Sequence, residues 1–243
     1  MTARGRWWAP LLIGAAALAS GRCASSAPPR EAAPAARQEA PPSALTPQAE
    51  TTPLIATTPP EWLTGDEWTF GWASGANTGI KVVAIAGSME IGGTRYYLAR
   101  VGDLDHLYTR DLRWAGALRS GRVEMRMTPP EPWFVWPLET GHRWSHQSRF
   151  EDSNGTKQRD DSFTVIGEET IEVPAGRFRA FKIVRRGADG DADEYWYAPQ
   201  VGYYVKWIGR RADTQFEELL QSYRPVPRLI PAPRGPTPPS DQK

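Results

Sequence analysis

Residues 194–208 read EYWYAPQVGYYVKWI, and this segment decides the class of fold. It is dense in aromatic and β-branched side chains, which favour β-strands. Pro199 has no N–H for a strand ladder and ends the first run, and Gly202 allows the chain to turn into the second. The segment therefore predicts two strands joined by a short turn.

Similar strand-length runs occupy the chain before this segment. Each alternates or is rich in β-branched and aromatic residues, and each is bounded by Gly, Pro, Asn or Asp. Including 194–208, the predicted runs are 68–73, 80–86, 95–101, 106–112, 123–128, 144–150, 161–166, 178–184, 194–197 and 203–208. Strands at a spacing of about 8–12 residues predict an antiparallel sandwich, a barrel or a curved sheet. The best helix candidates, 59–62 and 216–221, are short.

Proline and tryptophan divide the chain of 243 residues into a domain and two flanks. Of the 23 Pro, 9 lie in residues 23–60 and 7 in residues 225–243, whereas 9 of the 11 Trp lie in residues 61–224. We therefore predict a single β-domain over 61–224, a disordered Ala/Pro-rich tether over 23–60 and a disordered Pro-rich tail over 225–243.

The N-terminus has the pattern of an export signal. Arg4 and Arg6 precede an apolar stretch of 13 residues, 7–19, which is shorter than the roughly 20 residues of a spanning helix. Residues 1–22 are therefore predicted to be a signal peptide.

Cys23, the only cysteine, directly follows this signal. The placement resembles a bacterial lipoprotein, which implies a lipid anchor on Cys23 and, because Ala24 is not Asp, sorting to the outer membrane. The sequence departs from the usual lipoprotein pattern at Ser20 and Arg22. The alternative is cleavage after Ala19, which leaves a periplasmic or secreted protein with a free thiol.

Two segments of the domain begin alike. Gly65-x-x-Trp68-Thr69 recurs as Gly141-x-x-Trp144-Ser145, and residues 91–96 align loosely with 173–178. The similarity suggests two β-modules, with halves at 61–136 and 137–224. Coincidence between turn-plus-strand segments is the alternative, because such segments share residue preferences.

Three motifs resemble a known family. They are WPLxxGxxW at 136–144, EVPAGRF at 172–178 and YWYAPxVG at 195–202. In this order they resemble the TapB-like bacterial envelope proteins of unknown function, which are often lipoproteins and are similar to the LolA/LolB group. The resemblance covers about residues 60 to 224. It implies an all-β fold, a strongly curved antiparallel sheet that forms an incomplete barrel, and it supplies no catalytic residues.

Composition and motifs give no support for several functions. A net charge of +1 provides no electrostatic case for nucleic acid. His142 and His146 have the spacing of metal ligands on a helix, but on a strand they lie about 13 Å apart, so no metal is predicted. No nucleophile elbow, phosphate loop or dinucleotide motif occurs, so no cofactor and no enzymatic activity are predicted. A hydrolase acting on envelope material is the least favoured alternative.

The aromatic content is the one unusual feature, and it has two interpretations. Large rings ordinarily fill a core, but a curved sheet could also keep part of its lining open for an apolar ligand. The predicted function is an exported, non-enzymatic lipoprotein that binds a lipid-like ligand or an envelope partner in its concavity. A structural or interaction module with a filled core is the alternative. The candidate ligand-binding residues are Trp68, Trp72, Tyr97, Phe134, Trp136, Trp144, Phe181, Trp196 and Trp207.

Overall fold

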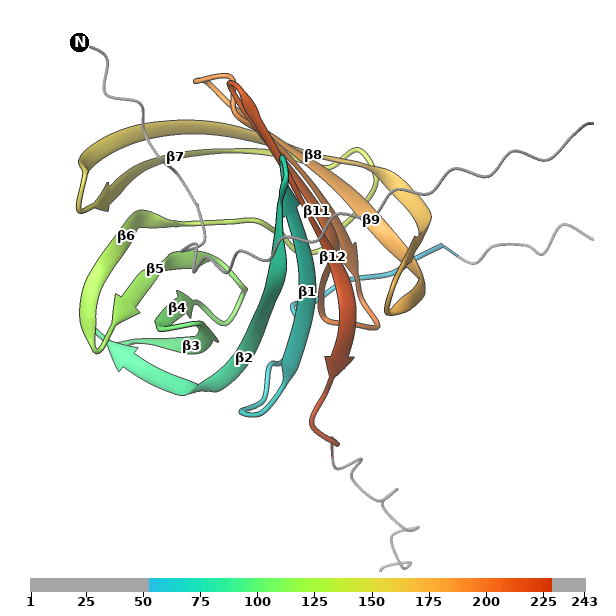
Figure 1. The fold of residues 1–243 in the computed structure, drawn as a ribbon, viewed down its shortest axis with the longest axis horizontal. Coiled ribbons are helices and arrows are strands. Elements are labelled where there is room, and N and C mark those ends of the chain that lie inside the picture. Colours follow the sequence, from blue (N-terminus) through green and yellow to red (C-terminus); the bar gives the residue numbers. More distant parts are fainter. Residues whose placement is uncertain (1–52, 229–243) are drawn as a thin grey trace, which may run out of the picture. The chain divides into compact units, whose positions relative to one another are not determined.

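The computed structural model describes residues 53–228, which form twelve β-strands and no helix (Figure 1). The strands are β1 (Glu67–Ser74), β2 (Asn77–Ile91), β3 (Thr94–Val101), β4 (Leu104–Tyr108), β5 (Trp114–Arg119), β6 (Arg122–Glu131), β7 (Arg143–Asp152), β8 (Gly155–Val173), β9 (Gly176–Gly187), β10 (Ala192–Ala198), β11 (Tyr203–Arg211) and β12 (Thr214–Arg224). The described part contains no helix that could cross a membrane. The predicted signal peptide, Cys23 and most of the predicted tether and tail lie outside these residues.

The strands form a closed barrel in which each strand is antiparallel to its neighbours in the chain (Figure 1). β1 pairs with β2 on one side and with β12 on the other, from Glu67 opposite Arg224 to Ser74 opposite Phe216. The all-β class is therefore confirmed, but the predicted incomplete barrel is wrong. Alternation within a strand is the same in open and closed sheets, so it does not report that the first and last strands meet.

The ten predicted runs all lie in strands or overlap them, and β5 and β12 were missed. In β12, residues 216–221 were a helix candidate because Glu, Leu and Gln favour helices, yet they pair with β1 and β11. Residues 59–62 also form no helix. Pairing on both sides outweighs the weak local preference.

The two copies of the Gly-x-x-Trp motif make equivalent backbone hydrogen bonds. The Gly65 N–H donates to the Ile85 carbonyl at 2.8 Å, and the Gly141 N–H donates to the Val165 carbonyl at 2.8 Å. Ile85 and Val165 both directly precede a register shift, in β2 and β8 respectively. These bulges bend two long strands at equivalent points. The two Gly-x-x-Trp segments therefore share their local backbone hydrogen bonding, and the division into halves at 61–136 and 137–224 stays a prediction.

The two joints between the halves are unequal. β1 and β12 share eight register pairs, whereas β6 and β7 share three, at residues 126–128 and 149–151. Pro129 and Pro130 lie within β6, directly after the paired residues 126–128, and have no N–H to donate. The β6–β7 joint is therefore the weaker of the two in backbone hydrogen bonding.

Two glycines with similar backbone geometry test how closely β5 and β6 approach. Gly116 (φ +137°) would place a Cβ 2.2 Å from the Met125 carbonyl oxygen, whereas a Cβ on Gly87 (φ +152°) would meet nothing within 4 Å. Both substitutions with Ala carry backbone strain, but only Gly116→Ala also clashes with backbone. We expect Gly116→Ala to lower the free energy of unfolding by about 1–3 kcal/mol more than Gly87→Ala, measured by urea denaturation. Equal losses would contradict the close approach of the strands.

Candidate functional site

An aromatic cage surrounds one tryptophan that precedes the first strand. The Trp62 indole lies 5.4 Å from the rings of Trp68 and Tyr97 and 5.3 Å from those of Tyr108 and Tyr203. We call these four rings the Trp62 box. They come from β1, β3, β4 and β11, so they join distant parts of the barrel wall. Tilted and edge-on contacts at these distances are favourable for aromatic pairs.

Ring contacts continue through the interior from this box. Trp133, in the segment after β6, lies 5.9 Å from Tyr108, 5.6 Å from Tyr195 and 6.0 Å from Trp207. Tyr108 belongs to β4, and the other two belong to β10 and β11 on a distant part of the wall. Side chains from separate parts of the wall therefore meet inside the barrel, and this part of the interior is filled.

A buried ionic network lies on the inner faces of β6 and of β8 to β11. We call it the charged belt, and its members are Glu131, Arg159, Asp161, Arg185, Asp193 and Arg211. The Arg185 side chain is only 3% exposed, and its guanidinium pairs with Asp193 and, at 2.9 Å, with Asp161. Three guanidinium groups face three carboxylates, so the belt carries no net charge.

Two indoles help to compensate the buried carboxylates. The Trp207 indole N–H donates to Asp193 at 3.0 Å, and the Trp133 indole N–H donates to Glu131 at 3.1 Å. Burial alone would lower the pKa of Arg185. Asp193 and the other nearby anionic groups raise this pKa by more than burial lowers it, so the net shift is upward. Arg185 is therefore a permanent cation at the centre of the belt.

Some buried polar atoms of this region make no hydrogen bond within the described structure. They are His146 Nε2, Ser148 Oγ, Asp161 Oδ2 and Arg185 Nε. Asp161 Oδ2 still lies 3.1 Å from an Arg159 nitrogen, but that contact is an ion pair without hydrogen-bond geometry. Burial lowers the pKa of His146 despite nearby Glu131 and Asp161. The neutral imidazole is thus the favoured form there.

A second, partly buried ion pair lies against the aromatic rings of the interior. Lys81 pairs with Glu218, and the Tyr204 hydroxyl donates to Glu218 at 2.7 Å. The Lys81 ammonium also lies over the rings of Phe70, Tyr204 and Trp207, at 5.1, 5.5 and 5.5 Å from their centroids. Burial raises the pKa of Tyr204, so its hydroxyl remains a donor. The cation is therefore held by both a carboxylate and aromatic faces.

The structure does not bring the nine candidate aromatics into one lining. Trp68, Tyr97 and Trp207 belong to the filled interior around Trp62 and Trp133. Phe134 and Trp136 lie in the segment after β6, where both contact Tyr197, and Phe181 pairs with Tyr197 across β9 and β10. Trp72 covers Gly79, and Trp144 stacks on Phe163 at 5.1 Å.

The last candidate, Trp196, lies on the opposite face of β10 from Tyr195. Its ring is flanked by the ammonium groups of Lys182 and Lys206, at 4.8 and 5.4 Å, and its indole N–H donates to Glu169 at 2.7 Å. Neighbouring strand residues point to opposite faces. Because Tyr195 contacts the interior rings, Trp196 packs on the outside of the barrel.

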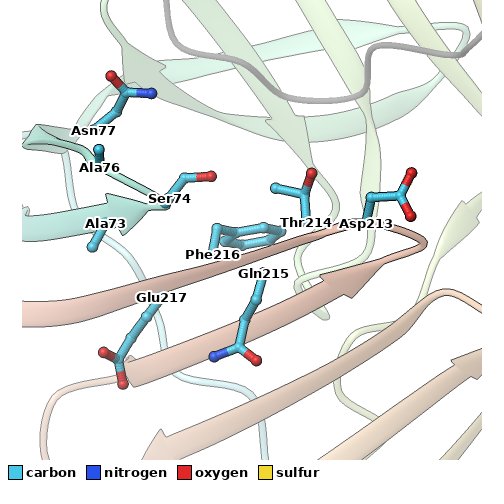
Figure 2. A pocket seen from close by; sticks show the side chains of 10 residues that line it. Ala73, Ser74, Ala76, Asn77, Asp213, Thr214, Gln215, Phe216 and Glu217 are labelled. Atoms are coloured by element: carbon cyan, nitrogen blue, oxygen red, sulfur yellow. The ribbon is translucent and has the colours of Figure 1, made fainter.

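An open groove of about 600 Å³ lies between two hairpin ends (Figure 2). It is lined by residues 73–77 of the β1–β2 hairpin and 213–217 of the β11–β12 hairpin. The Phe216 ring lies between Ser74 and Thr214, and Asp213 and Glu217 contribute carboxylates (Figure 2). Glu217 is paired with Lys206 at 2.6 Å. The groove therefore offers a single aromatic ring in a polar surround.

The arrangement of histidine and carboxylates gives no catalytic constellation around His106. Its Nδ1 accepts from the Trp114 indole at 3.1 Å, while Asp105, Asp103 and Asp111 each pair with an arginine. Within residues 53–228, no three His, Cys, Asp or Glu side chains are grouped to hold a metal ion.

Sequence reasoning missed the charged belt and the role of Trp62. A signal for the belt is present, because Asp193 stands in phase with Tyr195 and Tyr197, and Arg185 in phase with Ile183. A charge that alternates in step with buried residues points into the core. Trp62 precedes the first strand, so strand periodicity could not place it.

No model of a protein family matches the chain, and neither does any curated protein sequence. The TapB-like and LolA/LolB resemblance is therefore not supported by a family match.

Three solved structures show a partial likeness. A candidate lipoprotein from Parabacteroides distasonis is 13% identical, covers 70% of this chain and 99% of its own, and has a TM-score of 0.40. A candidate exported protein with a YmcC-like fold from Bacteroides fragilis is 12% identical. The match covers 70% of this chain and 100% of that protein, with a TM-score of 0.42. The hypothetical lipoprotein YmcC from Escherichia coli is 12% identical. The match covers 67% of this chain and 86% of that protein, with a TM-score of 0.36. Likenesses at these scores assign no function to this chain.

Removal of Arg185 tests the charged belt. We expect Arg185→Met to lower the free energy of unfolding by about 3–5 kcal/mol in urea denaturation, because Asp161, Asp193 and Glu131 would stay buried without their cation. Arg210→Met is the matched control, since Arg210 is half exposed in its pair with Glu194 and should cost at most about 1 kcal/mol. Similar losses in both variants would contradict a structural role for the belt.

His106 predicts a loss of stability in acid. Burial, helped by the charge of Lys81, lowers the pKa of His106 to about 4. The unfolded chain takes up this proton near pH 6.5 and the folded chain only near pH 4, so acidification through this window favours unfolding. Between pH 7 and pH 5 we expect a loss of about 2 kcal/mol from this group, measured by urea denaturation. In His106→Asn this part of the pH dependence should vanish. If the free energy of unfolding of the variant falls between pH 7 and pH 5 as steeply as in wild type, His106 is not the source of the loss.

Proposed function

We propose that this chain is an exported, membrane-anchored module without enzymatic activity, which acts through contacts on the outside of a filled barrel. The observation that carries the proposal is the contact of Trp133 with rings from separate parts of the wall, Tyr108 on one side and Tyr195 and Trp207 on the other. An apolar ligand would have to displace these rings.

The charged belt supports the same conclusion. A lipid chain placed against Arg185, Asp161 and Asp193 would bury ionic groups next to hydrocarbon, which is costly even for paired charges. Belt and rings together leave the described interior better suited to rigidity than to carrying a lipid. The distribution of the nine aromatic candidates over several places also favours this function over a lipid carrier.

The anchoring part of the proposal rests on the sequence. The signal pattern over 1–22 and the position of Cys23 support export and lipidation, and the Pro-rich residues 23–60 would hold the barrel away from the membrane. On the barrel, the groove between the hairpin ends at 73–77 and 213–217 provides a hollow for a polar partner segment.

Lipid analysis tests the filled barrel. A Cys23→Ser chain, purified without detergent from the periplasm, should carry no stoichiometric lipid in mass spectra of its organic extract. Added fatty acid or phospholipid should leave its melting temperature unchanged, because a ligand that binds only the folded state would raise it. A lipid bound at about one per chain, with a melting temperature that rises with lipid concentration, would reject a filled interior in favour of a carrier.

A further inference from the structure

The segment before β1, residues 53–66, lies against the barrel without forming a strand of it. We call it the strap. Ala56 makes a single bridge with Leu138, and the Leu54 N–H donates to the Glu168 carboxylate at 3.0 Å. The Trp62 indole N–H donates to the Gly202 carbonyl at 3.0 Å. The strap thus touches β8, the segment before β7 and the β10–β11 turn.

Trp62 is the largest buried side chain of the strap, which also buries Ala56 and Asp66. Trp62 is 2% exposed within its four rings, whereas Ile55 is 66% exposed. Three of the strap's residues are prolines, Pro53, Pro59 and Pro60, and contribute no N–H. The barrel ladder closes between β1 and β12 without any strap residue. Few backbone hydrogen bonds therefore oppose release of the strap, and segments of this kind open at a lower free energy than core strands.

A turn at the base of the strap can act as its hinge. The Asp66 carboxylate accepts from the Leu63 N–H at 2.8 Å and from the Val226 N–H at 2.7 Å, so this end is fixed to the barrel. Gly65 has φ +100°, and because it has no Cβ it can adopt other backbone angles at little steric cost. Residues 53–63 could leave the barrel while Asp66 and β1 stay in place.

We propose that the Trp62 box is a binding site for a tryptophan side chain presented by an extended peptide of a partner protein, and that the strap occupies this site in cis. The site recognises both parts of such a residue. Its rings enclose the indole, the Gly202 carbonyl accepts the indole N–H, and the Tyr97 hydroxyl accepts the backbone N–H at 3.2 Å.

The chemistry of the box selects against other side chains. A carboxylate would be desolvated against the negatively polarised ring faces of Trp68, Tyr97, Tyr108 and Tyr203. A phenylalanine would leave the Gly202 carbonyl without its donor. Tryptophan fills the cage and satisfies this acceptor.

The test uses the full chain with Trp62→Ala as host and two synthetic peptides as probes. The first peptide is residues 57–66, TTPPEWLTGD, and the second carries Ala in place of its Trp. Calorimetry should show saturable binding of the first peptide and at least about tenfold weaker binding of the second. The wild-type chain should bind the first peptide at least about tenfold more weakly than the Trp62→Ala host, because its own strap competes. Equal binding of both peptides by a folded Trp62→Ala host would overturn the proposal.

Two controls separate the box from a general effect of losing a buried tryptophan. Trp196→Ala removes a buried indole from the outer face of β10 and should bind neither peptide more tightly than wild type. If Trp62→Ala does not fold, hydrogen exchange on the wild-type chain replaces the binding assay. The amide of Trp62 should then exchange at least about tenfold faster than those of Tyr195 and Tyr204. Exchange of all three amides at one common rate would show that the strap opens only on global unfolding and would reject the site.

Discussion

Pairing of β1 with β12 is the constraint on which the rest of the structure depends. Through the eight pairs from Glu67–Arg224 to Ser74–Phe216, the sheet has no free edge strand at this joint, and every inward side chain shares one interior. In an open sheet, a charged residue on the concave face could reach solvent. In a closed barrel it must find its partner inside, and this requirement shapes the interior chemistry.

The charged belt and the Trp62 box are two solutions to that requirement. In the belt, Arg185 neutralises carboxylates from neighbouring strands, and indole N–H groups satisfy further oxygens. In the box, a tryptophan from outside the ladder fills the space between rings of four strands. A buried ionic network adds little net stability compared with apolar packing, but it penalises every arrangement in which one partner is missing. The belt therefore favours one register of the five strands that carry it.

Much of the local structure could be predicted because its causes are local. The turn at Pro199 to Gly202 is confirmed, since it depends on residues that fix or free a backbone angle within the turn itself. The repeated Gly-x-x-Trp motif likewise corresponds to equivalent hydrogen bonds at Gly65 and Gly141. By contrast, β12 was missed because its local preference is helical, and only its two neighbours make it a strand.

The candidate site was less predictable than the fold, for a geometric reason. The sequence identified Trp68, Tyr97 and Trp207 as aromatic strand residues, but it placed them with Trp196, which packs on the outer face. A shift of one residue reverses the face of a side chain, and bulges such as that between Trp196 and Tyr197 introduce that shift. By itself, the sequence determined that this protein is a β-domain with its turns at defined positions, because strand alternation and turn chemistry act over a few residues. Only the tertiary structure decided that the sheet closes, that Arg185 meets three carboxylates and that Trp62 occupies a cage, because these contacts join residues far apart in the chain.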